Sequence, residues 1–106
     1  MIEVTNDNLS VPTSGLFVVD FWAEWCGPCK RLMPILESVS SSRGDITFAK
    51  VDTEKNQKLT AEMGITALPT LVIFKDGQKV SKLIGLQTVD SLNQALDKIN
   101  LIKEAL

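Results

Sequence analysis

The sequence predicts an α/β protein whose mixed sheet carries helices on both faces. Three observations support this fold class. Apolar runs of strand length alternate with amphipathic segments along most of the chain, as in sheets whose parallel strands are joined by helices. Near the end, an Asp-Gly turn joins two consecutive strands, which makes part of the sheet antiparallel. The 106 residues, 44% of them hydrophobic, suffice for one core, so we expect a single three-layer domain over residues 1–106.

The first elements are predicted from short local signals. Residues 2–4 are expected to form a short edge strand, and Thr5 is a plausible cap for a short helix over residues 6–10. Residues 16–22 form a near-continuous apolar run, which is typical of a strand buried on both faces.

A long helix is predicted to begin around the two cysteines and to end at the polar segment 40–44. Pro34 lies inside this helix, where it removes a backbone hydrogen bond and is expected to produce a kink. Apolar residues recur at helical spacing, so one face of the helix packs on the sheet: Leu32, Ile35, Leu36 and Val39.

The second half repeats the alternation and ends in a hairpin. A strand is expected over residues 46–51, followed by a helix over residues 55–63 that Gly64 closes. Strands over residues 70–74 and 79–84 flank the Asp76-Gly77 turn. A final amphipathic helix follows, marked by Val89, Leu92, Leu96 and Ile99. The predicted order β-α-β-α-β-α-β-β-α contains five strands and four helices.

Charge and hydropathy exclude several classes of function. The net charge is −2 and acidic and basic residues are interspersed, so nucleic acid is not the expected partner. No apolar run approaches the length of a membrane span. The first residues, MIEVTNDNL, lack the basic start and apolar stretch of a secretory signal, so a full primary product is expected to be cytoplasmic. A matured exported chain is the alternative that the sequence leaves open.

Cys26 and Cys29 are the only cysteines, and the chain has no histidine. Cys26 follows a buried strand and opens a helix, where unpaired N–H groups and the helix dipole stabilise a thiolate, so we expect a lowered pKa for this thiol. Cys29 lies three residues later on the same helix face, so the two sulfurs can meet. Gly27 and Pro28 suit the first turn of a helix.

This position and spacing favour dithiol–disulfide exchange over two alternatives. The first is a pair of inert buried thiols. The second is a zinc site, which normally needs four ligands and would here have to be shared between chains. A purely structural disulfide is weakly supported, because so small a ring restricts the unfolded chain little.

Two charged residues interrupt predicted strands. Burial of Asp20 in its apolar strand should raise the pKa of the carboxyl, which would suit it to accept the proton of Cys29. The alternative is an Asp at a strand end that faces solvent. Lys50 could tune Asp20 as a nearby positive charge, or be an ordinary solvated lysine.

The residues around the cysteines include candidates for a partner-binding surface and two charged side chains. Trp25 on a loop would be partly exposed and would give a partner chain an apolar platform; the alternative is a ring folded onto the core. Trp22 is expected to pack beneath the site. Glu24 and Lys30 are expected to be solvated surface charges.

The stretch DFWAEWCGPCK, residues 20–30, resembles the thioredoxin family. The resemblance covers essentially the whole chain and includes further positions: Pro34, Lys50-Val51-Asp52, Gly64-Ile65, Pro69-Thr70-Leu71, Phe74-Lys75-Asp76-Gly77 and Gly85. It implies the thioredoxin fold, a central mixed five-stranded sheet flanked by four helices.

The resemblance also implies a general protein disulfide reductase that acts as an electron carrier in redox homeostasis. Cys26 would attack a client disulfide, and Cys29 would resolve the mixed disulfide, leaving a Cys26–Cys29 disulfide. Asp20 would be the buried proton acceptor, with Lys50 beside it. A flavin-dependent thioredoxin reductase would restore the dithiol with NADPH, so no cofactor is expected on this chain, which would act as a monomer.

The resemblance further implies a client-binding surface opposite the cysteines. An X–Pro bond is ordinarily trans, but the family has a cis proline at Pro69. Thr66, Ala67 and Leu68 would then present free backbone N–H and C=O groups to an extended client by strand addition. Gly85 and Leu86 would line the same surface, together with Trp25, Gly27 and Pro28; for Gly85 a plain strand end is the alternative.

Three functional hypotheses follow. The first is a reductant of protein disulfides. The second is an oxidant or isomerase of the same fold, because the reduction potential of the pair decides the direction. The third is a binding module that uses the apolar surface and not the thiols. The Gly-Pro pair between the cysteines matches reducing members of the family and favours the first.

Overall fold

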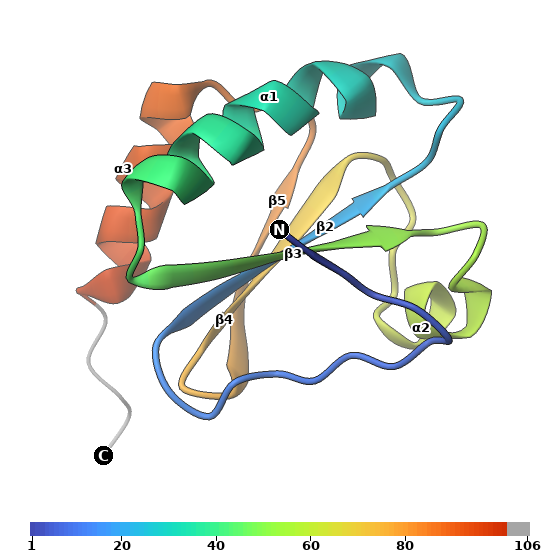
Figure 1. The fold of residues 1–106 in the computed structure, drawn as a ribbon, viewed down its shortest axis with the longest axis horizontal. Coiled ribbons are helices and arrows are strands. Elements are labelled where there is room, and N and C mark those ends of the chain that lie inside the picture. The colour runs from blue at the N-terminus through green and yellow to red at the C-terminus, as the bar shows by residue number, and fades with distance from the viewer. Residues whose placement is uncertain (102–106) are drawn as a thin grey trace.

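The computed structural model describes residues 1–101, which form five strands and three helices. Residues 102–106 of the predicted domain lie outside the described residues. In chain order the elements are β1 (Ile2–Glu3), β2 (Leu16–Trp22), α1 (Gly27–Ser42), β3 (Ile46–Asp52), α2 (Gln57–Glu62), β4 (Thr70–Lys75), β5 (Gln78–Ile84) and α3 (Val89–Asn100) (Figure 1).

The five strands form one mixed sheet in the order β1-β3-β2-β4-β5. β2 lies in the centre, parallel to β3 and antiparallel to β4. The hairpin between β4 and β5 turns at Asp76 and Gly77, whose φ angles of 52° and 87° are the positive values that a tight hairpin turn needs. The predicted mixed five-stranded sheet is confirmed.

Helices cover both faces of the sheet, as predicted. α1 and α3 lie on one face and α2 lies on the other (Figure 1). The side chains of β2 alternate between two apolar clusters because successive residues of a strand point to opposite faces. Val18 joins the cluster under α1 and α3, whereas Val19 joins the cluster that contains Leu59 of α2.

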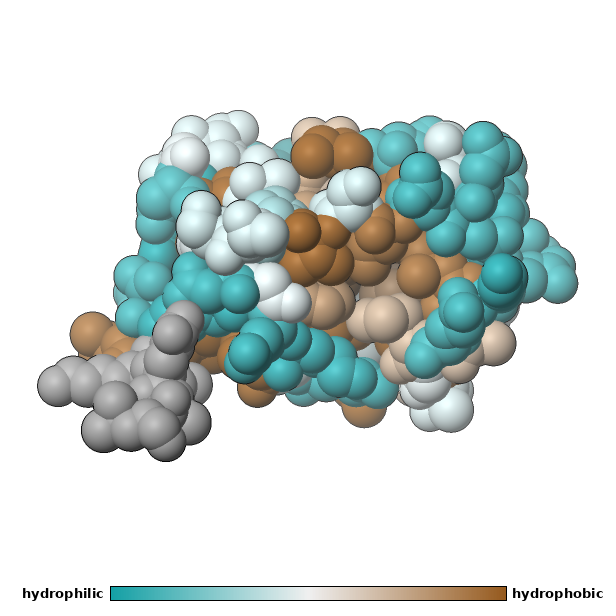
Figure 2. Space-filling model, turned by 90° about the horizontal axis from the view of Figure 1, so that it is seen from below, coloured by the Kyte–Doolittle hydropathy of each residue, from teal (hydrophilic) through white to brown (hydrophobic). Residues whose placement is uncertain are grey.

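The face opposite α1 carries an apolar surface patch that hydrophilic residues surround (Figure 2). The cluster on that side of the sheet is flanked by apolar side chains that are only partly buried: Leu9, Val11, Met63, Ile65 and Leu68. None of the helices formed by residues 1–101 has the length and apolar character that crossing a bilayer requires.

The prediction of four helices is wrong, because residues 6–10 form a turn in place of a helix. Asn6 and Asp7 have φ angles of 56° and 55°, in the left-handed region that no right-handed helix contains. Hydrogen bonds to distant residues hold this turn. The backbone N–H of Asp7 donates to Oδ1 of Asn56 at 2.9 Å, and the N–H of Leu59 donates to the Asp7 carboxylate at 3.0 Å. Long-range contacts therefore outweigh the local capping signal at Thr5.

Candidate active site

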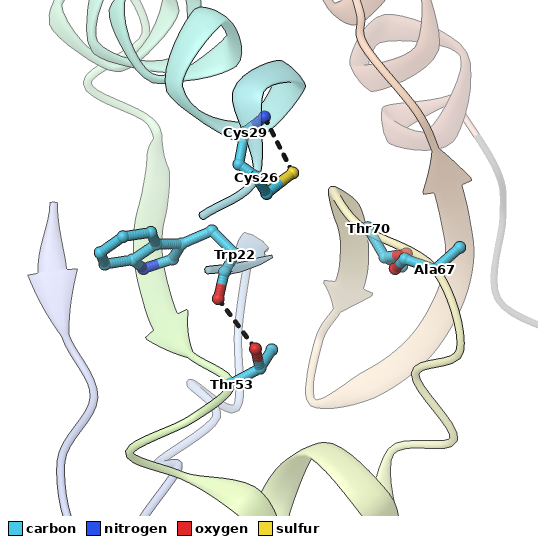
Figure 3. Close-up of a disulfide and its surroundings, with 6 residues drawn as sticks. All are labelled: Trp22, Cys26, Cys29, Thr53, Ala67 and Thr70. Atoms are coloured by element: carbon cyan, nitrogen blue, oxygen red, sulfur yellow. Dashed lines mark hydrogen bonds between the residues drawn. A yellow bond between two sulfur atoms is a disulfide. The ribbon is translucent and has the colours of Figure 1, made fainter. Parts of the chain in front are cut away.

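A short loop connects the end of β2 to the start of α1, where the two cysteines lie. Cys26 is the cap residue, with φ −90° and ψ 107°, and its Sγ accepts a hydrogen bond from the backbone N–H of Cys29 at 3.2 Å (Figure 3). Pro28 occupies the first turn, where its missing N–H costs no hydrogen bond. The two cysteine sulfurs are joined in a disulfide, with the Cα atoms 5.3 Å apart. The predicted meeting of the sulfurs is confirmed.

The two cysteines are both buried. Cys26 is 5% exposed and Cys29 is 1% exposed, and both pack with Ala23 in a small apolar cluster. Trp22 and Leu68 lie against this cluster, so Trp22 packs beneath the site as predicted. Cys26 is therefore the less deeply buried residue of the pair, and Cys29 is enclosed.

Asp20 is buried within β2 and is 1% exposed, so the alternative of a solvent-facing Asp is wrong. Neither carboxyl oxygen receives a hydrogen bond from the described residues. Burial raises the pKa of Asp20 from 3.8 to about 7, while the positive charge of Lys50 acts to lower it. The predicted rise is confirmed, and its cause is the removal of the charged form from water.

Lys50 lies on β3 in parallel register with Asp20 on β2. Paired residues of neighbouring strands project from the same face, so Lys50 is the lateral neighbour of the carboxyl. Its side chain is half-buried, unlike that of an ordinary solvated lysine. On its other side, Lys50 is paired in register with Glu3 of β1, a relationship that the sequence did not reveal.

The loop before β4 lies beside the cysteines, and its Leu68–Pro69 peptide bond is cis, as the resemblance implied. The Pro69 carbonyl accepts the backbone N–H of Gly85 at 2.9 Å, which ties Gly85 to the same surface. The resemblance implied a free carbonyl at Ala67. This carbonyl accepts a hydrogen bond from the Thr70 hydroxyl at 2.6 Å (Figure 3) and is therefore only partly free. Among the described residues, no backbone hydrogen bond engages Thr66.

A pocket of about 410 Å³ adjoins this loop and Trp25, which is 71% exposed. The exposure of Trp25 excludes the alternative of a ring folded onto the core. Sequence reasoning found four of the lining residues, Trp25 and 66–68, but missed Thr53, Thr60 and Ile65. These three lie in the turn after β3, in α2 and in the loop after α2, and only the fold brings them together at the pocket.

The remaining predicted residues do not line this pocket and differ in exposure. Leu86 is 46% exposed, and so is available to a partner. Gly85 follows β5 and has a φ of 95°, a conformation that strains any residue with a side chain. Gly27 is exposed and Pro28 is half-buried, while Glu24 and Lys30 are exposed, as predicted.

The family model described as Thioredoxin matches residues 2–98. A thioredoxin of Chlamydia muridarum is 41% identical over 96 residues, covering 90% of this chain and 94% of that protein. A thioredoxin of Staphylococcus aureus is 40% identical over 100 residues, covering 92% and 96%. The X-ray structure of Fasciola hepatica thioredoxin is similar with a TM-score of 0.76 and 37% identity, covering 81% and 83%.

These relatives span nearly the full length of the chain, and the cysteine pair that defines their chemistry lies at the start of α1. The chain therefore belongs to the thioredoxin family of dithiol–disulfide oxidoreductases.

Proposed function

We propose that the protein reduces disulfide bonds of many client proteins through Cys26 and Cys29. The observation that carries this proposal is the hydrogen bond from the Cys29 N–H to Cys26 Sγ at the start of α1. A backbone donor and the positive end of the helix dipole both stabilise a thiolate on Cys26 once the pair is reduced. Cys26 is also the less deeply buried residue of the pair.

The exchange proceeds in two balanced steps. The Cys26 thiolate attacks one sulfur of the client disulfide, forming a mixed disulfide, and the second client sulfur leaves as a thiolate. The Cys29 thiolate then attacks Cys26 Sγ, forming the intramolecular disulfide and releasing the first client sulfur. Two electrons pass to the client, and the oxidised pair is the state that the structure contains.

Asp20 serves the second step as the proton acceptor. Cys29 must lose its proton before it attacks, and a carboxyl whose pKa burial has raised to about 7 is matched to neutral pH. Lys50 tunes this group by favouring its ionised form.

Clients dock beside the cysteines as an extended chain. The unpaired backbone of Thr66 and Leu68 offers hydrogen bonds to main chain of any sequence. Trp25 provides an exposed aromatic contact, and the rest of the proposed surface consists of Gly27, Pro28, Ala67, Pro69, Gly85 and Leu86.

A flavin-dependent thioredoxin reductase would return the disulfide to the dithiol with electrons from NADPH. In this proposal the flavin and NADPH belong to the reductase, and the protein acts as a cytoplasmic monomer made of one domain over residues 1–106. Neither a nucleic acid nor a membrane takes part.

The experiment that tests the proposal uses the full chain, reduced and freed of reductant, and a peptide with one disulfide. We expect stoichiometric reduction of the peptide, and no reduction by the variant with Cys26→Ser and Cys29→Ser. Equilibration with glutathione should place the reduction potential of the pair below that of the glutathione pool. A potential well above it would assign the protein as an oxidant or isomerase instead.

A further inference from the structure

A second pocket of about 390 Å³ lies beside β1 and β3, and the exchange mechanism does not use it. It carries three carboxylates and two ammonium groups. None of its lining residues lines the pocket beside Trp25, so a client held there would leave this one open. The charged lining residues are Glu3, Glu24, Lys50, Asp52 and Lys55.

One of these residues connects the pocket with the buried carboxyl. Asp20, Lys50 and Glu3 occupy paired positions on β2, β3 and β1, so they stand in a row on one face of the sheet. Neighbouring strands are about 4.8 Å apart, which places the Glu3 backbone roughly 10 Å from that of Asp20, with Lys50 between them. Exposure increases along the row, from buried Asp20 through half-buried Lys50 to exposed Glu3.

The Lys50 ammonium is not committed to either carboxylate. It forms no ion pair with any carboxylate in residues 1–101. Its side chain lines the pocket together with Glu3, and its charge acts on Asp20 from the other side. A flexible lysine between two carboxylates moves toward whichever is ionised and unpaired, because Coulomb attraction rises as the separation falls.

The other charged residues of the pocket are not part of this row, and Lys55 lies exposed in the turn after β3. The Asp52 carboxylate accepts the backbone N–H groups of Glu54 and Lys55, which holds it at the turn after β3. Glu24 lies on the loop after β2 and not on a strand of the row. On the opposite side, the β4 neighbour of Asp20 is Leu71, and the buried side chains of α1 and α3 carry no charge.

We propose that Glu3 is a positioning residue for the exchange reaction, which draws the Lys50 ammonium toward the pocket and thereby controls the pH at which Asp20 gains and loses its proton. This inference rests on the proposed role of Asp20 as proton acceptor. Glu3 favours the protonated form of Asp20, both by drawing Lys50 away and by its own negative charge.

The test is an NMR titration of the Asp20 carboxyl carbon in the oxidised protein, in which the cysteines do not titrate. Glu3→Gln should lower the midpoint by about half a pH unit, the size expected for the loss of one charge at this distance. Glu24→Gln is the matched control, since it removes another acid from the same pocket that does not stand in the row, and it should shift the midpoint by less than Glu3→Gln. The pH midpoint of mixed-disulfide release should move with the Glu3→Gln titration.

A second pair of variants tests the route through Lys50. Lys50→Met should raise the midpoint of Asp20, and adding Glu3→Gln to Lys50→Met should then lower it by much less than in the wild-type background. An unchanged midpoint in Glu3→Gln, an equal shift in Glu24→Gln, or an undiminished shift in the Lys50→Met background would overturn the proposal. The titration needs no client, so such a result leaves the proposed function intact; failure of the wild-type protein to reduce a peptide disulfide would remove that function instead.

Discussion

The backbone N–H of Cys29 donates a hydrogen bond to Sγ of Cys26 at 3.2 Å. Cys29 is thus both the disulfide partner of Cys26 and the donor of the hydrogen bond that Cys26 accepts as the N-cap of the helix. This contact comes from the helix geometry alone, because the cap side chain ordinarily accepts from the third helical N–H. Reduction of the disulfide leaves the donor in place. In the proposed function, Cys26 is therefore the attacking group and Cys29 the resolving group.

The two cysteines are predicted to behave differently when each is replaced. Cys29→Ser should accumulate a stable mixed disulfide with client proteins, because Cys26 can attack and nothing resolves the product. Cys26→Ser should capture few or none, because the remaining cysteine, Cys29, is only 1% exposed. Non-reducing gel electrophoresis after alkylation measures both outcomes. Equal capture by the two variants would contradict the assignment.

Asp20→Asn is predicted to slow release of the client more than its capture. The amide cannot accept the proton of Cys29, and a general base typically contributes about a hundredfold or more to the step it serves. Stopped-flow measurement of mixed-disulfide formation and decay separates the two steps. If both slowed by the same factor, Asp20 would act on the structure of the site and not on the proton.

The buried carboxyl of Asp20 should also make the stability of the oxidised protein depend on pH. Its pKa is raised from 3.8 to about 7 in the folded state, so the folded protein binds the proton more tightly than the unfolded chain. Stability is then greatest below pH 3.8 for this group and falls as pH rises through 7. The difference of about 3 units corresponds to a loss of roughly 4 kcal/mol.

Denaturant unfolding of wild type and Asp20→Asn at several pH values measures this effect, since the other groups titrate in both proteins. The free energy of unfolding of the variant should increase relative to that of wild type as pH rises from 4 to 8. If the difference in the free energy of unfolding between the two proteins stays constant with pH, the pKa of Asp20 is not raised in the folded state.

Trp25→Ala is predicted to weaken client reduction without loss of stability. The side chain is 71% exposed, so its removal should change the free energy of unfolding by less than about 0.5 kcal/mol. Loss of an aromatic contact with the client should lower the rate constant at low client concentration by about tenfold. Leu101→Ala, which removes an 81% exposed apolar side chain after α3, is the control and should leave the rate unchanged.

The elements with strong periodicity were predictable from sequence. The apolar run of β2 and the repeating apolar positions of α1 report burial directly, so their places in the sheet and on its face followed. The turn at residues 6–7 was not predictable, because Asn56 holds it from far along the chain. Asn56 is 1% exposed, and its amide also donates to the Val4 carbonyl at 3.2 Å. An Asn that bridges two distant loops looks locally like any surface Asn.

The same distinction applies to the site. The cysteines, Asp20 and Trp25 are marked by their positions in a motif. Glu3 carries no such mark, because only the pairing of β1 with β3 sets it beside Lys50. Thr53 and Thr60 join the pocket near Trp25 through the fold of the chain between β3 and β4. Strand register and loop contacts depend on residues that are far apart in the sequence, so no local sequence pattern predicts them.

The central claim is tested most directly by titration of the Cys26 thiol in the reduced protein, followed by its ultraviolet thiolate absorbance or its rate of alkylation against pH. We predict a pKa for Cys26 below the ordinary value of about 8.5 for a free cysteine. A Cys26 pKa at or above the ordinary value would contradict it.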